Sequence, residues 1–374
     1  MINDYRIADA DGHWNEPADL WEKGLPPELL SLAPQFTGEG IAFDFQGQHY
    51  PKFPADYPAD IKERVKVHMD AQAKEYYKAI GVDRNAPWTP DIQVKGMDML
   101  GIDVAYIYPT RGLQAWAIDD LDPRVAAAMA TVYNDWGYGF AQYDPKRLKP
   151  MAGISLHDPV AAVVELKRVA ERGVAGIFMR PNPLNGRLLS DPAYETFWTE
   201  CERLNVAVGV HEGGYTLLKA AGADRFGRRF SLHATSHPME HMMAFLALLE
   251  GGVLERHPNL RFAFLESGCG WVPYWLFRLD YEYGNLAMEV GDTVKMKPSD
   301  YFRRQCWVSF EPEEPYIPAV IDSIGEDRLL FASDYPHPDH PPDILDEVME
   351  LEGVLTKKVL KKILWDNPLA FYGK

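Results

Sequence analysis

Residues 8–17 read ADADGHWNEP, and three acid or imidazole side chains occupy every second position in this stretch. They are Asp9, Asp11 and His13. In an extended strand, residues i, i+2 and i+4 point to the same face, so a strand here would project all three in one direction. Carboxylates beside an imidazole form part of the ligand set that proteins offer to divalent metals. The stretch therefore predicts a β-strand whose end carries metal ligands.

Short apolar runs recur along the rest of the chain. After YRIADA (5–10) they are VAYIYP (104–109), PMAGIS (150–155), VAGIFM (174–179), VAVGVH (206–211), RFAFLE (261–266), CWVSF (306–310) and LLFAS (329–333). Between them lie segments with helical spacing, clearest over 122–143, 158–173 and 238–258, the last of which begins at Pro238. Strands that alternate with helices indicate βαβ units and a parallel sheet.

Eight such units are the number that closes a (β/α)8 barrel, an α/β fold of the TIM type. The alternative is an open doubly wound sheet. That fold usually carries a glycine-rich turn after its first strand, and ADGHWNEP is not one. We therefore predict the barrel.

The stretch from about 18 to 90 does not follow this alternation. It is rich in Pro, Tyr and Lys, and it contains one predicted helix near 60–80. Because a strand precedes it, we interpret it as an insertion after the first strand, over the barrel mouth, rather than as a separate N-terminal domain. The prediction is a single domain over 1–374.

Composition excludes several classes of function. The chain has 374 residues, 47% of them apolar, and a net charge of −17, which argues against a nucleic-acid-binding surface. No apolar run approaches the 18 or so residues of a membrane span, and no signal peptide is recognisable, so we expect a cytoplasmic protein. Three widely separated cysteines, Cys201, Cys269 and Cys306, predict small buried side chains rather than disulfides.

The candidate metal ligands lie at the ends of the predicted strands. In this fold the active site lies at the carboxyl ends of the strands. Asp11 and His13 end the first run, His211 ends VAVGVH, Glu266 ends RFAFLE and Asp334 follows LLFAS. Because four different strands end in residues able to bind a metal, we predict that these five residues form a metal site.

Other histidines surround this set. His237 precedes Pro238, which indicates the entry to a helix, and from there it could act as a sixth ligand. His233 and His241 are interpreted as polar lining or packing residues, and Asp9 as structural or as a support for the ligands. His340 is expected to be exposed.

Four residues are predicted to contact substrate. Arg180 ends VAGIFMR, and its guanidinium fork suits a carboxylate, with a structural ion pair as the alternative. Trp14 and Trp271 flank ligand positions and could form pocket walls, although core packing would explain them equally well. His337 follows Asp334 closely, beside the metal or the substrate.

Several motifs together resemble a known family. ADADGHWNEP, GVLERHPNLRFAFLESGCGW (252–271), FASDYPHPD (331–339) and NPLAFYG (367–373) resemble the amidohydrolase-related family, in the branch typified by aminocarboxymuconate semialdehyde decarboxylase and resorcylate decarboxylases. The resemblance implies a barrel fold. It places the family's metal ligands on Asp11, His13, His211 and Asp334.

The chain departs from this family at one position. Where the decarboxylases usually read HGG after the sixth strand, it reads Glu266-Ser267-Gly268. A carboxylate accepts hydrogen bonds only, unless its pKa is raised, so we predict that Glu266 is a ligand rather than a proton donor. Five or six protein ligands exceed the three of a catalytic zinc and would suit two metals, or iron or manganese. Another branch that resembles this ESG-type sequence contains metal-dependent oxygenases.

Three functional hypotheses follow. The leading one is a metal-dependent lyase or hydrolase for a small carboxylated, aromatic or cyclic substrate, with zinc or manganese as cofactor. Asp334 would be the general base, and His211 and Glu266 would complete the catalytic set. The second is a dinuclear oxygenase that uses iron, manganese or both. The third is a non-catalytic partner subunit.

We expect a homodimer, or a heteromer, in which 57–90 or 271–284 supplies the interface.

Overall fold

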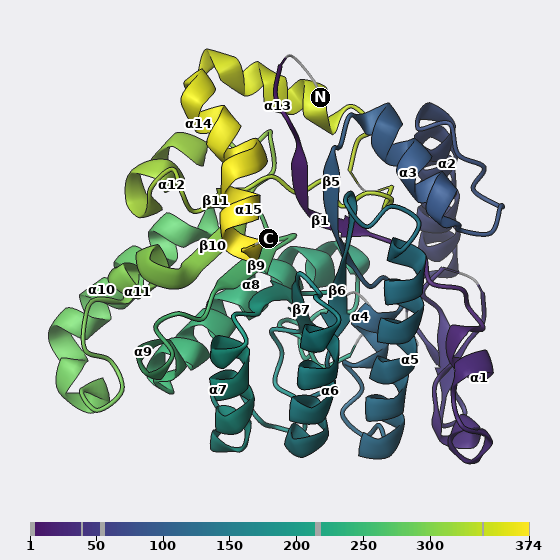
Figure 1. Cartoon of the computed structure of the whole chain (residues 1–374), viewed down its shortest axis with the longest axis horizontal. Coiled ribbons are helices and arrows are strands. Elements are labelled where there is room, and N and C mark those ends of the chain that lie inside the picture. Colours follow the sequence, from purple (N-terminus) through teal and green to yellow (C-terminus); the bar gives the residue numbers. More distant parts are fainter. Residues whose placement is uncertain (1–3, 39, 53–56, 214–217, 339, 374) are drawn as a thin grey trace.

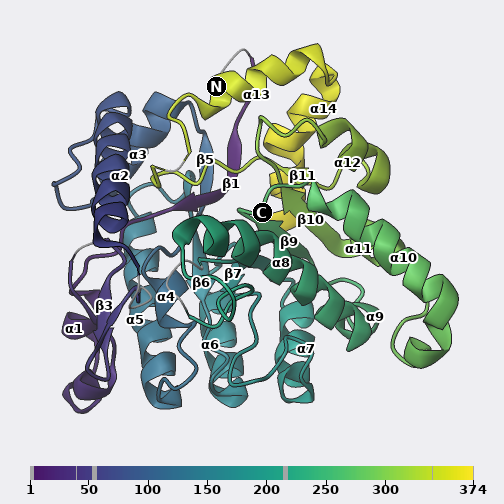
Figure 2. The same cartoon turned by 180° about the vertical axis from the view of Figure 1, so that it is seen from behind.

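The computed structural model describes residues 4–38, 40–52, 57–213, 218–338 and 340–373. Eight parallel strands form one sheet in the order β1-β5-β6-β7-β8-β9-β10-β11, and helices surround it (Figures 1 and 2). Each apolar run of the sequence overlaps one strand, so the predicted (β/α)8 barrel is confirmed. The strands are β1 Ala8–His13, β5 Val104–Tyr108, β6 Leu148–Gly153, β7 Gly176–Met179, β8 Ala207–His211, β9 Phe262–Leu265, β10 Cys306–Ser309 and β11 Leu329–Leu330.

Backbone hydrogen bonds link the first strand to the segment that follows the last one. The N–H of Ala10 donates to the carbonyl of Phe331 at 2.9 Å, and the N–H of His13 donates to that of Tyr335 at 2.6 Å. In the other direction, the N–H of Asp334 donates to the carbonyl of Asp11 at 2.9 Å. The sheet is therefore nearly closed, and β1 lies beside the segment that follows β11 at this seam.

The outer layer consists mainly of helices. They are α3 Pro90–Leu100, α4 Gly112–Ala115, α5 Pro123–Ala141, α6 Pro159–Glu171, α7 Glu195–Arg203, α8 Arg229–Glu250, α9 Val253–Arg256, α10 Trp271–Val290, α11 Pro298–Gln305, α12 Ile317–Ile324, α13 Ile344–Glu350, α14 Lys357–Lys361 and α15 Asn367–Tyr372. Helices α5 and α6 match two predicted ranges. Each begins with Pro after an Asp, Asp122 or Asp158, whose carboxylate accepts a hydrogen bond from the first turn. None of the helices in the described ranges is long and apolar enough to span a bilayer.

The third predicted helix begins earlier than its sequence indicates. We expected a start at Pro238, but α8 runs from Arg229 to Glu250 with Pro238 inside it. Proline usually ends or kinks a helix because it lacks an N–H donor. Here burial of the inner face of α8, from Leu232 to Leu249, outweighs that local preference. His237 therefore lies in a helix interior rather than at a helix entry.

The segment between β1 and α3 forms its own small layer. It contains α1 Leu20–Gly24, α2 Ala59–Ala79 and an antiparallel sheet of β2 Gln35–Phe36, β3 Phe43–Phe45 and β4 Gln48–Tyr50. Helix α1 packs on α5 at the side of the barrel. Near the end of α2, the hydroxyl of Tyr77 donates to the carbonyl of Pro336 at 3.2 Å. The insertion thus covers the side of the barrel and reaches the loop after β11.

Candidate metal centre

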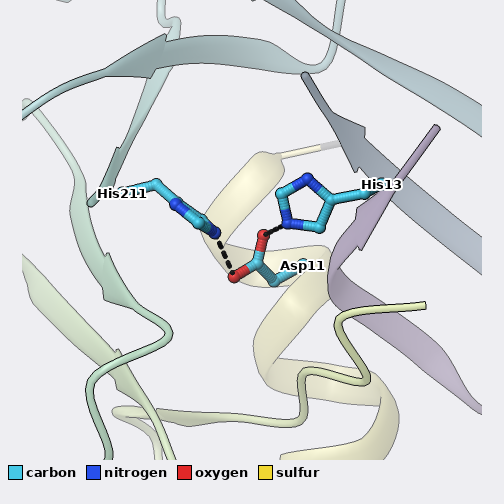
Figure 3. A group of neighbouring side chains, drawn as sticks. All are labelled: Asp11, His13 and His211. Atoms are coloured by element: carbon cyan, nitrogen blue, oxygen red, sulfur yellow. Dashed lines mark ion pairs between the residues drawn. The ribbon is translucent and has the colours of Figure 1, made fainter. Parts of the chain in front are cut away.

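Asp11 lies between two imidazoles at the end of the barrel strands (Figure 3). Its Oδ1 atom lies 3.5 Å from Nε2 of His13, and its Oδ2 atom lies 3.4 Å from Nε2 of His211. A third strand end adds Asp334, whose Oδ1 lies 3.0 Å from Nε2 of His13. A fourth adds Glu266, whose Oε2 lies 3.1 Å from Nε2 of His211. The structure therefore brings together all five residues that the strand ends predicted.

Both imidazoles are held with the same edge facing inward. The Nδ1 atom of His13 lies 2.8 Å from the carbonyl of Pro109, and Nδ1 of His211 lies 2.5 Å from the carbonyl of Glu212. A carbonyl only accepts, so each Nδ1 carries the proton and each Nε2 of the neutral ring offers a lone pair. Backbone carbonyls orient metal-binding histidines in this way.

Among the residues that the structure describes, four buried atoms at the centre have no hydrogen-bond partner. They are Oδ1 and Oδ2 of Asp11 and the Nε2 atoms of His13 and His211. A buried polar atom without a partner costs free energy, and such groups are rare in folded proteins. A divalent cation would satisfy all four at once, since carboxylate oxygen and imidazole nitrogen are its usual ligands. The residues present therefore fit a metal ion.

Glu266 and Asp334 share an unusual backbone conformation. Their φ angles are 52° and 54°, in the left-handed region that residues with a side chain rarely adopt. Each follows a strand, β9 or β11, and each points its carboxylate into the centre. Strain of this kind is common where a fold holds a functional side chain in place.

A second group of ligand atoms adjoins the first. His233 and His237 lie one turn apart on α8, with ring centroids 4.5 Å apart. Nε2 of His237 lies 3.8 Å from Oε2 of Glu266, and ligand atoms of these three residues all lie within 4.8 Å of one another. Because Glu266 also reaches His211, it connects the two groups. His233, which we expected only to line the site, belongs to this cluster.

Asp334 is surrounded by histidines. Its Oδ1 atom lies 2.7 Å from Nδ1 of His337, and its Oδ2 atom lies 3.2 Å from Nδ1 of His340. On their far sides, His337 contacts the hydroxyl of Thr110 at 2.9 Å and His340 contacts Glu311 at 2.9 Å. The expectation that His340 is exposed was wrong, because the loop after β11 folds back over Asp334 and leaves 18% of the His340 side chain exposed.

Burial and charge shift the pKa values of these groups. Burial raises the pKa of Asp11 to about 7 and lowers the pKa of His211 to about 4. Burial alone would raise the pKa of Asp334, but His337, His13 and His340 outweigh it and hold this pKa well below its usual value. The centre thus keeps His211 neutral and Asp334 ionised, as metal ligation requires.

Arg180 is paired within the chain. Its side chain is buried, and its Nη2 group donates to the carboxylate of Glu212. The other contacts are Nη1 to the carbonyl of Leu113 at 2.8 Å and Nε to Oδ1 of Asn182 at 3.0 Å. The guanidinium fork therefore holds a carboxylate of this chain, as the structural alternative expected, and contact of Arg180 with a substrate stays a prediction.

The two tryptophans pack within the protein. Trp14 is fully buried against α5, where its Nε1 donates to the hydroxyl of Tyr133 at 3.1 Å and its ring meets Trp136 edge-on. The ring of Trp271 packs edge-on against Phe264 at a centroid distance of 5.9 Å. Core packing accounts for the buried indole of Trp14, while Trp271 is partly buried. Contact of either ring with a substrate stays a prediction. Cys201, Cys269 and Cys306 are free and buried, as predicted.

Comparison with known proteins gives the family. The family model described as Amidohydrolase matches residues 8–374. The chain belongs to this amidohydrolase family. The family resemblance inferred from the sequence motifs is therefore confirmed, and the protein is an enzyme of the metal-dependent amidohydrolase superfamily.

Two curated relatives of this amidohydrolase are decarboxylases. It is 24% identical to 2-amino-3-carboxymuconate-6-semialdehyde decarboxylase of Dictyostelium discoideum over 298 residues, which cover 78% of each chain. It is 28% identical to gamma-resorcylate decarboxylase of a Rhizobium species over 277 residues, which cover 68% of this chain and 79% of the relative.

Solved structures share the fold. An amidohydrolase from Mycobacterium avium subsp. paratuberculosis superposes with a TM-score of 0.78 at 21% identity, over 99% of this chain and 100% of the other. A dihydroxybenzoic acid decarboxylase from a Polaromonas species, crystallised with bound manganese, superposes with a TM-score of 0.70 at 18% identity, over 99% and 97%. These superpositions show that the two proteins share the fold of this chain. The donor set at its own centre is what supports a divalent metal ion as the cofactor.

Proposed function

We propose that this amidohydrolase is a carboxy-lyase that releases carbon dioxide from a small aromatic acid, with one manganese or zinc ion per chain. The observation that carries the proposal is a set of four buried ligand atoms on Asp11, His13 and His211 at the strand ends. None of the four has a hydrogen-bond partner in the described part of the chain. Asp334 adds an ionised carboxylate to the same point. The names of the two curated relatives support the reaction class.

The proposed decarboxylation needs a Lewis acid and a source of one proton. A bound divalent ion would supply Lewis acidity, which polarises a substrate oxygen. Loss of carbon dioxide from an aryl carboxylate leaves an electron pair on the ring carbon, and that carbon must then take up one proton. Glu266 stands where related decarboxylases carry an imidazole, so the proton has to come from another group. Asp334 and His337, whose Oδ1 and Nδ1 atoms lie 2.7 Å apart, would hold and deliver it.

An assay of metal-stripped and reloaded protein tests the proposal. Hydroxylated benzoic acids would be offered, and carbon dioxide release followed by coupled enzymes. We expect turnover with manganese or zinc, none after chelation, and at least a ~10²-fold loss in His337→Gln, the lower bound for a residue in general acid–base catalysis. Release that survives complete removal of metal would refute the proposal.

A second candidate function rests on the cluster of His233, His237 and Glu266. Three further ligand atoms within 4.8 Å of one another, joined to the first group through Glu266, offer room for a second ion. Carboxylate-rich sites with histidine suit iron and manganese. On this basis the alternative is a dinuclear oxygenase, which would reduce dioxygen with electrons from an external donor while it oxidises its substrate.

Metal stoichiometry distinguishes the two functions. Elemental analysis of gently purified protein should give about one metal per chain for the lyase, and about two with substrate-dependent oxygen consumption for the oxygenase. In the second case His233→Ala and Glu266→Ala should each lose one metal, while His257→Ala serves as a control. His257 is bound to Glu195 and Glu202 away from the centre, so its loss should leave metal content unchanged.

A further inference from the structure

A chain of hydrogen bonds leads from the candidate metal centre to Arg180. The ring of His211 points from the end of β8 towards Asp11 (Figure 3), and its Nδ1 atom lies 2.5 Å from the carbonyl of Glu212. The carboxylate of the same Glu212 accepts a hydrogen bond from Nη2 of Arg180. The residue whose main chain orients the imidazole is therefore itself held through its side chain.

Arg180 is bonded at every nitrogen of its guanidinium group. Besides the contact of Nη2 with Glu212, Nη1 donates to the carbonyl of Leu113 at 2.8 Å, and Nε donates to Oδ1 of Asn182 at 3.0 Å. These partners belong to the end of β8, to α4 after β5, and to the loop after β7. A planar guanidinium fixed in this way cannot turn without breaking several hydrogen bonds. Arg180 thus ties three parts of the barrel rim together.

Helix α4 also holds the residue that follows Glu212. Nε2 of Gln114 donates to the carbonyl of Gly213 at 2.6 Å. The space here is tight, since a Cβ atom at Gly213 would lie 3.0 Å from Nε2 of Gln114 and 3.1 Å from Nη1 of Arg180. The main chain at Glu212 and Gly213 is therefore fixed by two side chains, one a guanidinium and the other an amide.

The pair of Arg180 and Glu212 is buried and carries no net charge. It therefore does not attract a cation, and a buried ion pair contributes little net stability because both groups lose their hydration. What it supplies is a fixed geometry. We propose that Arg180 is a positioning residue for the metal ion: through Glu212 it holds the carbonyl that directs Nε2 of His211 into the centre. This inference rests on the metal centre of the proposed function.

Manganese affinity separates positioning from charge. Arg180→Met should raise the manganese dissociation constant about 10-fold or more, since loss of a group that orients a metal ligand costs about 10–100-fold in affinity. If the guanidinium acted only through its positive charge, the same substitution would tighten manganese binding. Arg180→Lys keeps the charge but not the planar fork, so it should also weaken binding. Unchanged or lower dissociation constants in both variants would overturn the proposal and leave substrate contact as the role of Arg180.

A neutral double variant guards against misfolding. Arg180→Met alone leaves Glu212 as a buried, unpaired charge, which destabilises the fold. Arg180→Met combined with Glu212→Gln removes both charges and should fold, as circular dichroism would show, yet bind manganese about 10-fold more weakly. The matched control is Arg168→Met, because Arg168 on α6 pairs with Glu165 at 2.6 Å in the outer layer. Wild-type affinity in the folded double variant, or an equal loss in Arg168→Met, would overturn the proposal.

The metal-free protein gives a readout that does not require the proposed reaction. The Nδ1–H group of His211 is buried and hydrogen-bonded, so its NMR signal should persist against exchange with water. In Arg180→Met this exchange should be at least about 10-fold faster, while Nδ1–H of His13, bound to Pro109, serves as the internal control. Absence of manganese binding in the wild type would refute the metal centre itself. An unchanged His211 signal in Arg180→Met, beside normal wild-type binding, would overturn only the role of Arg180.

Discussion

His13 and Asp334 come from the first strand and from the segment after the last one, yet Nε2 of the imidazole lies 3.0 Å from Oδ1 of the carboxylate. Backbone hydrogen bonds between the two segments fix this approach, with the N–H of Asp334 bound to the carbonyl of Asp11. The backbone contacts that close the barrel therefore also bring the ligands of the centre together. A change at Asp334 should affect the site without undoing the seam, because the seam consists of main-chain contacts.

Asp334→Asn tests this separation. The amide keeps the shape of the side chain but removes the negative charge that His13, His337 and a metal ion would share. We expect turnover to fall about 10³-fold or more and metal content to drop, while the circular dichroism spectrum stays that of the wild type. Carbon dioxide release and elemental analysis give the two readouts.

The control for that variant is Asp327→Asn. Asp327 is 64% exposed and pairs with Lys362 at 2.6 Å, far less buried than Asp334. It should keep both activity and metal content. Full activity in Asp334→Asn would remove that residue from the mechanism.

Metal binding should weaken in acid. Asp11 must be ionised to bind a cation, and burial raises its pKa to about 7 in the metal-free protein. Below pH 7 the cation must displace a proton, so the manganese dissociation constant should rise about tenfold for each pH unit between 7 and 5. Calorimetry in two buffers of different ionisation enthalpy would count the proton released. An affinity that is equal at pH 6 and pH 8 would contradict the assigned pKa.

The strand ends of this protein were predictable because they obey local rules. A run such as VAVGVH is long enough for one strand, and parallel strands bring their carboxyl ends to one rim. The predicted ligands at these strand ends therefore lie close together, as expected. They are His13, His211, Glu266 and Asp334. The alternation of Asp11 and His13 predicted their common direction for the same reason.

Other features depended on contacts distant in sequence. Pro238 indicated a helix start, and only the buried face of α8 shows that the helix begins nine residues earlier, at Arg229. His233 was missed as a cluster member for this reason. Arg180 and Glu212 follow neighbouring strands β7 and β8, so their pairing could have been found from charge at adjacent strand ends. Nothing local to the sequence around His340 shows that its loop folds back over Asp334.

Gly209→Ala should destabilise the protein. A Cβ at Gly209 would lie 1.8 Å from the hydroxyl of Tyr108, whose ring stacks near His211 at a centroid distance of 5.8 Å. Overpacking of this kind costs about 1–3 kcal/mol, and the displaced Tyr108 should also weaken metal binding. Urea denaturation and a manganese titration measure the two effects.

Gly139→Ala is the matched control. Gly139 lies in α5, and a Cβ there would meet no atom within 4 Å. Because alanine favours a helix over glycine, this variant should gain up to about 1 kcal/mol in stability. Equal stability of the two variants would mean that Tyr108 moves aside at little cost.

His241 should make the metal-free protein sensitive to acid. Burial lowers the pKa of His241 from 6.5 to about 3, and its ring packs near Phe264. Between these two values the unfolded chain binds a proton that the folded chain does not, so the stabilisation is complete above pH 6.5 and declines as the pH falls. One such group lowers the free energy of unfolding by about 1.4 kcal/mol per pH unit, or about 2 kcal/mol between pH 6.5 and pH 5.

His241→Met isolates this contribution, because methionine fills a similar volume and does not titrate. Urea denaturation of the metal-free variant and wild type, at pH 7.5 and at pH 5, gives the difference in slope. The variant should lose about 2 kcal/mol less than the wild type over this range, since its unfolded chain binds one proton fewer. Equal losses in the two proteins would show that His241 is already protonated in the folded state. That result would require a buried acidic partner for the ring, such as a carboxylate turned towards α8.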